Sequence, residues 1–301
     1  MSAINTIHID TPDTIVGLSE LHLAYLGPTC ITIGFSARKA IEASQQVVEQ
    51  VVRDERVIYG INTGFGQLAQ TVVPADRLLD LQKNLVRSHS AGVGEPLDDA
   101  VVRLTLLLKV ASLARGRSGV RPVIVDTLSR LLEREIYPVI PSKGSVGASG
   151  DLAPLAHLAG VLIGEGQVRI QGEVVSASEG LRVAELAPLE LGPKEGLALL
   201  NGTQVSTALA LGGLFETEDL LLAAVVAGAM AVEASKSSHT PFDERIHTAR
   251  GQRGQAIIAA AFRRFLTGSA INESEKNSGR VQDPYSVRCQ PQVLGACLDL
   301  M

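Results

Sequence analysis

Apolar residues recur at helical spacing along most of the chain. Between residues 37 and 56 they lie on one helical face, with Ser36 as the expected N-cap. The same spacing predicts further helices over 76–90, 98–115, about 122–135 and 203–236. Because the last of these is apolar nearly all round, we expect other helices to surround it, from the same subunit or from neighbours.

Two regions show the alternation of short strands instead. The first 35 residues contain the β-branched stretches I-H-I-D and C-I-T-I with turn residues between them. Residues 167–176, Q-V-R-I-Q-G-E-V-V-S, alternate around Gly172 as a small hairpin does. The pattern therefore predicts a mainly α fold with a small, mixed N-terminal region and one short β-hairpin.

The composition supports helix packing and excludes two classes of partner. The 301 residues are 46% apolar but only 3% aromatic, with no Trp, so aliphatic side chains must fill the interior. Acidic residues exceed basic ones, 32 to 27, without a basic stripe, which argues against nucleic acid as a partner. The longest apolar run, Leu220 to Val232, is too short for a membrane span, so we expect no membrane association.

The cysteines and the chain ends bear on location and completeness. Cys30, Cys289 and Cys297 have no C-x-x-C spacing and leave one over if two pair. This pattern favours free, mostly buried thiols in a reduced, cytoplasmic protein. The first residues lack the charged start and apolar run of a signal peptide. A new amphipathic helix opens at Gln290 and reaches Met301 without a stop signal, which is typical of a fragment.

The stretch G-S-V-G-A-S-G-D at 144–151 is the candidate for chemistry. Ser149 follows Gly-Ala as in the G-x-S-x-G nucleophile elbow, but the fifth position is Asp151 and no strong strand precedes it. The pattern of a phosphate loop is absent because Lys143 precedes the glycines and no G-K-[ST] follows. Taken alone, the stretch is typical of a tight turn into a helix, with Asp151 stabilising the helix start.

The same stretch also permits a reaction of the backbone itself. The Gly150 nitrogen has no side chain beside it, so it can approach the Ala148 carbonyl carbon if the loop bends tightly. Ring closure with loss of two waters, one of them from the Ser149 side chain, would leave a methylene conjugated to a carbonyl. Such a group is an electron sink that no ordinary side chain supplies.

The surrounding sequence resembles one family. G-S-V-G-A-S-G-D-L-A-P-L-A-H is similar to the signature of the aromatic amino-acid ammonia-lyases and aminomutases, in which Ala-Ser-Gly cyclises to 4-methylideneimidazol-5-one (MIO). The resemblance covers most of the chain from about residue 35. Further motifs resemble the family in the same order: Y-G-I-N-T-G-F-G at 59–66, N-L-V-R-S-H-S-A-G-V-G at 84–94, L-L-N-G-T-Q at 199–204, P-F-D-E-R-I-H at 241–247 and V-Q-D-P-Y-S-V-R-C-Q-P-Q at 281–292.

The resemblance implies a role for each matching residue. Ala148, Ser149 and Gly150 would form the MIO electrophile, and no metal is implied. Tyr59 is similar to the tyrosine that removes the β-proton, for which its pKa must lie below the usual value of about 10. Asn201 is similar to the asparagine that hydrogen-bonds the ring and helps to keep it electrophilic.

A second group of matching residues lies on one loop, D-P-Y-S-V-R. Arg288 is similar to the arginine that pairs with the substrate carboxylate, to which a planar guanidinium is suited. Tyr285 and Gln282 are similar to residues that orient the substrate and the ring. Each residue also has an ordinary structural interpretation, such as a turn, a helix cap or an ion pair. Their joint occurrence with Ala-Ser-Gly in one order favours the catalytic roles.

The pair Ser88-His89 bears on the substrate. At the matching position, members that act on phenylalanine tend to have Phe-Leu and those that act on tyrosine His-Leu, whereas Ser-His resembles the members that act on histidine. A histidine on a helix can also be purely structural, and the remaining histidines lack metal-ligand spacing. The resemblance therefore implies deamination of L-histidine to trans-urocanate and ammonia.

The resemblance also implies an assembly and a domain layout. We expect a long-helix bundle of the ammonia-lyase (fumarase/aspartase-like) type, a homotetramer with shared active sites, an MIO-bearing domain over 1–200 and the start of a central bundle over 201–301. Family chains are longer, and their C-terminal part supplies a phenylalanine and a glutamate to the site. Two alternatives stay open: a tyrosine or phenylalanine lyase or aminomutase of the same family, and an inactive helical scaffold.

Overall fold

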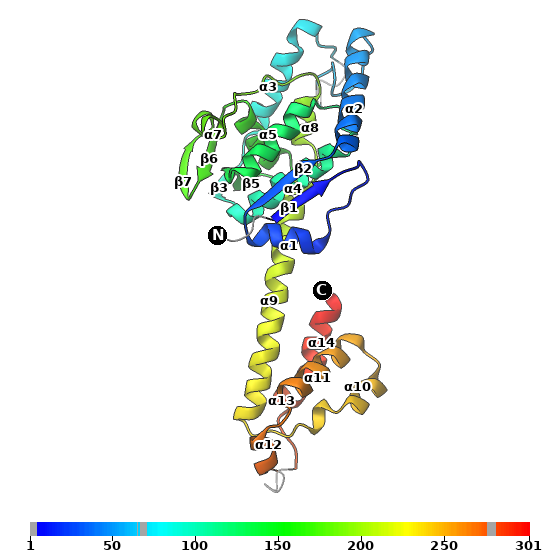
Figure 1. The fold of residues 1–301 in the computed structure, drawn as a ribbon, viewed down its shortest axis with the longest axis vertical. Helices are drawn as coiled ribbons and strands as arrows, with labels where there is room; N and C mark the ends of the chain where they lie inside the picture. The colour runs from blue at the N-terminus through cyan, green and yellow to red at the C-terminus, as the bar shows by residue number, and fades with distance from the viewer. Residues whose placement is uncertain (1–4, 65, 67–70, 276–280) are drawn as a thin grey trace. The chain divides into compact units, whose positions relative to one another are not determined.

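The computed structural model describes residues 5–64, 66, 71–275 and 281–301, and the chain forms two compact units, Met1–Gly212 and Gly213–Met301. Helices dominate both units and the strands are short, which confirms the predicted mainly α fold (Figure 1). Helix α9 (Gln204–Ala234) begins in the first unit and ends in the second. The functional division into an MIO-bearing domain over 1–200 and a bundle domain over 201–301 stays a prediction.

The N-terminal strands form a parallel pair. Strand β1 (Asn5–Ile9) runs beside β2 (Thr29–Ile33), with Asn5 opposite Thr29 and Ile9 opposite Ile33. The prediction of turn residues between the two strands was wrong. Helix α1 (Leu18–Leu26) occupies the connection, because parallel strands need a crossover too long for a tight turn.

Helix α4 (Asp99–Ala114) forms the centre of the first unit. Most of its side chains are buried, and α1, α2 (Phe35–Arg53) and α5 (Pro122–Glu133) pack against it. The prediction of Ser36 as the N-cap of α2 was wrong. The helix already begins at Phe35, after Gly34, so that Ser36 lies within its first turn.

Three helices pack against one another and carry predicted site residues at their ends or directly beside them. They are α3 (Leu78–His89), which follows a 3₁₀ turn at Ala75–Arg77, α6 (Leu152–Leu162) and α8 (Glu195–Leu200). The short strands β3 (Val93–Pro96) and β5 (Pro141–Lys143) pair antiparallel between the end of α3 and the start of α6. This pairing draws the segment after His89 toward the loop that begins at Gly144.

The predicted hairpin is present. Strands β6 (Gln167–Ile170) and β7 (Glu173–Ser176) pair antiparallel, and the two residues between them, Gln171 and Gly172, have positive φ angles of 49° and 88°. Two consecutive positive φ values are the geometry of the type I′ turn, which is common in two-residue hairpins. Strand β4 (Ile136–Pro138) pairs with β6, and helix α7 (Ala177–Val183) follows the hairpin.

The second unit packs short helices against the C-terminal part of α9. Its core includes Val232, Phe242 and Phe262, and the two rings stack with centroids 4.9 Å apart. The elements are η3 (Thr240–Phe242), α10 (Glu244–Arg250), α11 (Arg253–Phe265), α12 (Ala270–Glu275), α13 (Tyr285–Arg288) and α14 (Gln290–Leu300). Within this chain α9 is not surrounded, since Leu220 and Met230 are 69% and 67% exposed.

The three cysteines are free thiols, but the expectation that they are mostly buried was wrong. Cys30 and Cys289 are half-buried, and Cys297 is exposed on the short terminal helix. Burial raises the pKa of the Cys30 thiol. In the described part of the chain, no helix combines the length and the apolar character that crossing a bilayer requires.

Candidate active site

The Ala-Ser-Gly loop is a tight turn between β5 and α6. Gly147 and Gly150 have φ angles of 70° and 105°, and isolated β-bridges pair both Gly147 and Ala148 with Gly150. Residues other than glycine rarely adopt such backbone angles. The tight turn predicted from the sequence is therefore present, and it folds Gly150 back toward Ala148. Ser149 is exposed at its tip.

The backbone of Gly202 lies against Gly150. A β-carbon at position 150 would stand 2.5 Å from the Gly202 carbonyl oxygen and 2.9 Å from its nitrogen. The N–H of Asp151 donates to the same carbonyl at 2.7 Å. Gly202 itself has a φ of 144°. The two segments thus meet backbone to backbone, and no side chain larger than hydrogen fits at Gly150 without displacing Gly202.

Asp151 joins the loop to the start of α9. Its buried carboxylate accepts hydrogen bonds from the hydroxyls of Ser145 at 2.8 Å and Ser206 at 2.5 Å, and from the Ser206 N–H at 2.7 Å. From the sequence we expect Asp151 to stabilise the helix that directly follows it. The side chain makes no cap bond to α6 and serves α9 instead, because the contact between Gly150 and Gly202 brings the first turn of α9 beside it.

Asn201 ends helix α8, and buried polar groups fix the position of that helix. Glu195 is 1% exposed and pairs with the guanidinium of Arg121 at 2.7 Å. The Gly196 N–H donates to Oε1 of the fully buried Gln82, 3.0 Å away on α3. Both contacts tie the first turn of α8 to its neighbours, so the exposed side chain of Asn201 projects from an anchored helix.

Lys109 is a polar residue of the site that the sequence analysis missed. It lies on α4, is 1% exposed, and its Nζ donates to the main-chain carbonyl of Asn201 at 3.0 Å. Burial lowers the pKa of Lys109 to about 7, and the negative charge of Asp151 opposes this shift. The available signal was a single charge within the otherwise uncharged stretch of residues 104–114.

The predicted substrate pair lies at the C-terminal end of α3. The hydroxyl of the exposed Ser88 donates to the Leu85 carbonyl at 3.1 Å. Nδ1 of the half-buried His89 lies 2.9 Å from the same carbonyl. Because a carbonyl oxygen can only accept, this bond requires the proton on Nδ1, which leaves Nε2 of the neutral ring as an acceptor.

A half-buried histidine connects this end of α3 to the Ala-Ser-Gly loop. The N–H of Gly92 donates to Nε2 of His157 on α6 at 3.0 Å. A β-carbon at Gly144 would lie 3.0 Å from the Gly92 α-carbon, so the two backbones pack closely. Burial lowers the pKa of His157, which favours the neutral ring that can accept this bond. The segment after His89 is thereby fixed against the beginning of the loop.

Tyr59 lies in a turn that follows α2 and is 54% exposed. The neighbouring Asn62 stabilises the turn, because its Oδ1 accepts from the Ile58 N–H at 2.9 Å and its Nδ2 donates to the Arg56 carbonyl at 2.8 Å. Of the surrounding motif at 59–66, Phe65 lies outside the described residues. The structure therefore presents the Tyr59 side chain on the surface of the first unit.

The remaining predicted residues belong to the second unit. Gln282 and Arg288 line a cavity of about 630 Å³, in which Nε of Arg288 donates to the Asp283 carbonyl at 3.3 Å. The buried carboxylate of Asp283 accepts from the Ser238 N–H at 2.7 Å and so anchors the loop. Tyr285 is 75% exposed and lines a separate hollow of about 320 Å³ beside α14.

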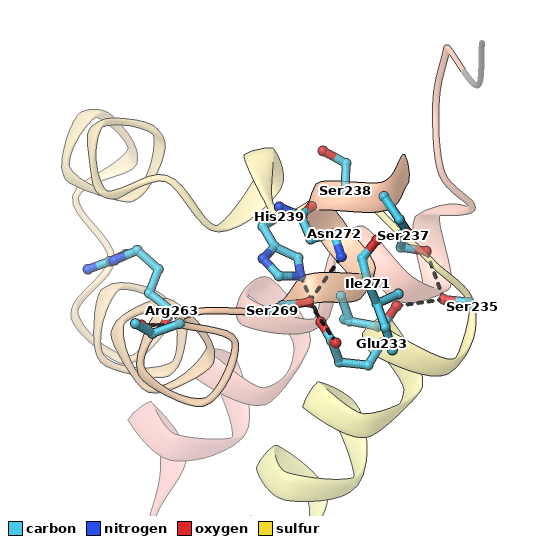
Figure 2. A network of polar contacts seen from close by, with 12 residues as sticks. Glu233, Ser235, Ser237, Ser238, His239, Arg263, Ser269, Ile271 and Asn272 are labelled. Carbon is cyan, nitrogen blue, oxygen red and sulfur yellow. Dashed lines mark hydrogen bonds and ion pairs between the residues drawn. The ribbon is translucent and has the colours of Figure 1, made fainter. Parts of the chain in front are cut away.

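One wall of the Arg288 cavity is held by a polar network around Glu233. Figure 2 shows His239 and Ser269 directed toward this carboxylate. Nε2 of His239 lies 2.9 Å from Oε1 of Glu233, and the Ser269 hydroxyl donates to Oε2 at 2.8 Å. The N–H of Asn272 donates to Ser269 at 3.0 Å. Both His239 and Asn272 line the cavity, so the network fixes part of the cavity wall.

Besides Tyr59 on the surface of the first unit, the predicted site residues form two sets. The first unit brings together the Ala-Ser-Gly loop and Asn201, and packs the segment that follows Ser88-His89 against that loop. The second unit carries Gln282, Tyr285 and Arg288 on one loop and short helix.

The sequence model of the aromatic amino acid lyase family matches residues 18–301. The chain belongs to this family. It is 57% identical to the histidine ammonia-lyase of Paracidovorax citrulli (strain AAC00-1) and 56% identical to that of Pseudomonas fluorescens (strain SBW25), in each case over 94% of this chain. The match covers 56% of each relative, so the chain spans about half the length of the curated relatives it matches.

Solved structures of the aromatic amino acid lyase family share the fold. A histidine ammonia-lyase from Trypanosoma cruzi superposes with a TM-score of 0.82 at 35% identity, covering 98% of this chain and 54% of that protein. The phenylalanine aminomutase of Pantoea agglomerans gives a TM-score of 0.87 at 32% identity, covering 97% of this chain and 60% of that protein. The fold is therefore common to family members with different reactions, and it does not by itself select the substrate.

Proposed function

We propose that the protein is a histidine ammonia-lyase, which converts L-histidine to trans-urocanate and ammonia without oxidation. The observation that carries the proposal is the 56–57% identity, over 94% of this chain, to relatives named histidine ammonia-lyase. The pair Ser88-His89, which resembles the members that act on histidine, supports the same substrate.

The Ala-Ser-Gly loop fits the formation of MIO. In the proposed ring closure the Gly150 nitrogen bonds to the Ala148 carbonyl carbon, and the carbonyl oxygen leaves as water with the N–H protons of Ser149 and Gly150. A second water takes the Ser149 hydroxyl and α-proton, which leaves a methylidene group. The tight turn suits this reaction because it folds Gly150 back toward Ala148. Gly150 also has no β-carbon, and the Gly202 carbonyl lies where that atom would be.

The other predicted site residues would then bind the substrate and move its protons. MIO supplies an electrophilic methylidene carbon, which makes the amino group of the substrate a better leaving group. Arg288 would pair with the substrate carboxylate and Tyr59 would accept the β-proton. Asn201 would hydrogen-bond the ring, while Tyr285 and Gln282 would orient the substrate.

His89 offers a basis for histidine recognition. Its hydrogen bond to the Leu85 carbonyl fixes the proton on Nδ1, so Nε2 can accept a hydrogen bond. We propose that this acceptor receives the N–H of the substrate imidazole. A substrate without that N–H, such as phenylalanine, would leave the acceptor unpaired, and such losses discriminate strongly between substrates.

We further propose that the active enzyme is a cytoplasmic homotetramer. Helix α9 exposes Leu220, Leu222 and Met230, which are 69%, 66% and 67% accessible. Apolar groups at this density on one helix are typical of surfaces that other helices cover in an assembly.

The assay that tests the function compares L-histidine, L-tyrosine and L-phenylalanine as substrates of the purified protein. We expect the ultraviolet absorbance of urocanate to rise with L-histidine and no comparable product from the other two. Formation of cinnamate or coumarate without urocanate would contradict the proposed substrate and favour another lyase of the family. The absence of every product, in protein whose loop has not cyclised, would favour the scaffold alternative.

A further inference from the structure

Lys109 is buried where an apolar side chain would be less costly. Among the residues that the structure describes, it is the one buried lysine, at 1% exposure. It lies on α4, whose neighbouring positions Leu107 and Val110 are fully buried and apolar. Removing an ammonium group from water is expensive unless it is compensated. Packing alone therefore does not account for a lysine at this position.

The hydrogen bond that Lys109 makes leads directly to the Ala-Ser-Gly loop. Nζ donates to the carbonyl of Asn201 at 3.0 Å. The next residue, Gly202, lies against Gly150 and accepts the Asp151 N–H at 2.7 Å. The Lys109 amine thus holds the Asn201–Gly202 peptide, which packs against Gly150 of the loop.

A buried carboxylate compensates the charge of Lys109. Asp151 is 1% exposed, and its negative charge favours the protonated form of Lys109. The same carboxylate bonds Ser145 before the Ala-Ser-Gly triplet and Ser206 in the first turn of α9. Lys109 and Asp151 therefore bind the two backbone segments that meet at Gly150, the Ala-Ser-Gly loop and the segment that leads into α9.

We propose that Lys109 is a positioning residue for ring closure of Ala148-Ser149-Gly150. By holding the Asn201 carbonyl, it keeps Gly202 pressed against Gly150, so that the Gly150 nitrogen stays at the Ala148 carbonyl carbon. The bonds formed and broken are those of the cyclisation described above, and Lys109 exchanges no proton in them. The inference rests on the proposed formation of MIO.

The test follows cyclisation by mass. Trypsin releases residues 144–169, because Lys143 and Arg169 flank the loop. The fraction of this peptide that has lost two waters is measured at intervals during cell-free synthesis of the full chain. Three variants are compared with the wild type: Lys109→Met, which removes the donor, Lys109→Arg, which keeps it, and the control Thr105→Val, which removes a buried hydroxyl bonded only within α4, to Val101. Circular dichroism and the unfolding midpoint establish that each variant is folded.

We expect Lys109→Met to fold and to cyclise about tenfold more slowly, the factor for losing one hydrogen bond from a charged donor. Lys109→Arg should retain most of the wild-type rate and Thr105→Val all of it. A folded Lys109→Met that cyclises at the wild-type rate would overturn the inference, and so would equal slowing of Lys109→Met and Lys109→Arg. A merely structural role would lower the midpoint without changing the cyclisation rate of folded protein.

Two further outcomes are also decisive. If Lys109→Met does not fold, Lys109→Gln replaces it; slowing by a factor of about three or more is expected from the loss of the charge, and the wild-type rate would overturn the inference. If the wild-type peptide itself never loses two waters, the proposed function fails. If the wild type cyclises and Lys109→Met cyclises equally fast, only the inference about Lys109 fails.

Discussion

The carbonyl oxygen of Gly202 stands where a β-carbon of residue 150 would be, at a separation of only 2.5 Å. Two segments 52 positions apart in the sequence therefore meet without side chains, at the point where the cyclising nitrogen lies. The contact gives Gly150 of G-S-V-G-A-S-G-D and Gly202 of L-N-G-T-Q one shared physical reason. Because neither residue has a side chain, the backbones of Gly150 and Gly202 can come into contact.

Replacing Gly150 by alanine should prevent cyclisation and lower stability. The alanine would meet the Gly202 backbone and also adopt a φ of 105°. We expect the free energy of unfolding to fall by about 3 kcal/mol, from strain of the backbone and overpacking together. Urea denaturation measures the loss, and the mass of the tryptic peptide 144–169 reports cyclisation.

Gly166→Ala is the matched control for this variant. Gly166 has a comparable φ of 87°, but a β-carbon there would meet nothing within 4 Å. It should cost only the backbone strain, about 1 kcal/mol, and leave cyclisation intact. Equal losses of stability in the two variants would contradict the contact between Gly150 and Gly202.

Asp151→Asn should loosen the loop from the start of α9. The carboxylate accepts from Ser145 and twice from Ser206, and an amide cannot accept at both of its atoms. We expect a loss of about 2 kcal/mol in the free energy of unfolding, the range for a hydrogen bond to a buried charge. Denaturation of Asp151→Asn beside Ser145→Ala, which removes one partner, checks this. A variant as stable as the wild type would refute the anchoring role.

The protonation of Lys109 should make stability depend on pH. Its pKa is lowered to about 7 in the folded protein, whereas an unfolded lysine titrates at about 10.4. Between these values the unfolded chain binds more protons, so the free energy of unfolding should rise by about 2 kcal/mol from about pH 7 to about pH 9. Below the folded-state pKa both states are protonated and the dependence disappears.

Comparison with Lys109→Met isolates this contribution. The variant lacks the titrating amine. Over the same pH range its free energy of unfolding should therefore rise by about 2 kcal/mol less than that of the wild type. Urea denaturation of both proteins at the two pH values gives the difference. Parallel pH profiles would show that Lys109 is protonated to the same extent in both states.

His89→Leu should weaken the use of L-histidine. The change removes the Nε2 acceptor while the end of α3 keeps its main-chain bonds. A fall of about tenfold to a hundredfold in kcat/KM is expected for the loss of one buried hydrogen bond to the substrate. Ser90→Ala is the control, because the Ser90 hydroxyl donates to Val86 within α3. Equal effects of the two changes would argue against a substrate contact at His89.

The sequence pattern was sufficient for the long amphipathic helices and for the hairpin, since periodicity and the Gln171-Gly172 turn are local signals. It was insufficient where tertiary contact decides. Helix α1 exists because two parallel strands need a crossover. Asp151 caps α9 rather than its own helix because Gly202 lies beside Gly150.

The candidate site shows the same division. Ala148, Ser149 and Gly150 could be singled out from adjacent residues, because the motif is contiguous and the turn is local. Lys109 lies 92 positions from the carbonyl it binds, and no spacing rule connects the two. Buried polar groups of this kind are visible only after folding, when their partners are known.

In the proposed function, Ala148-Ser149-Gly150 closes into an electrophilic ring. The most direct measurement is the mass of the tryptic peptide 144–169 from the purified wild-type protein. We expect a peptide lighter than its sequence by two water molecules, with Ser149→Ala as the unreactive control. A wild-type peptide of unmodified mass would contradict it.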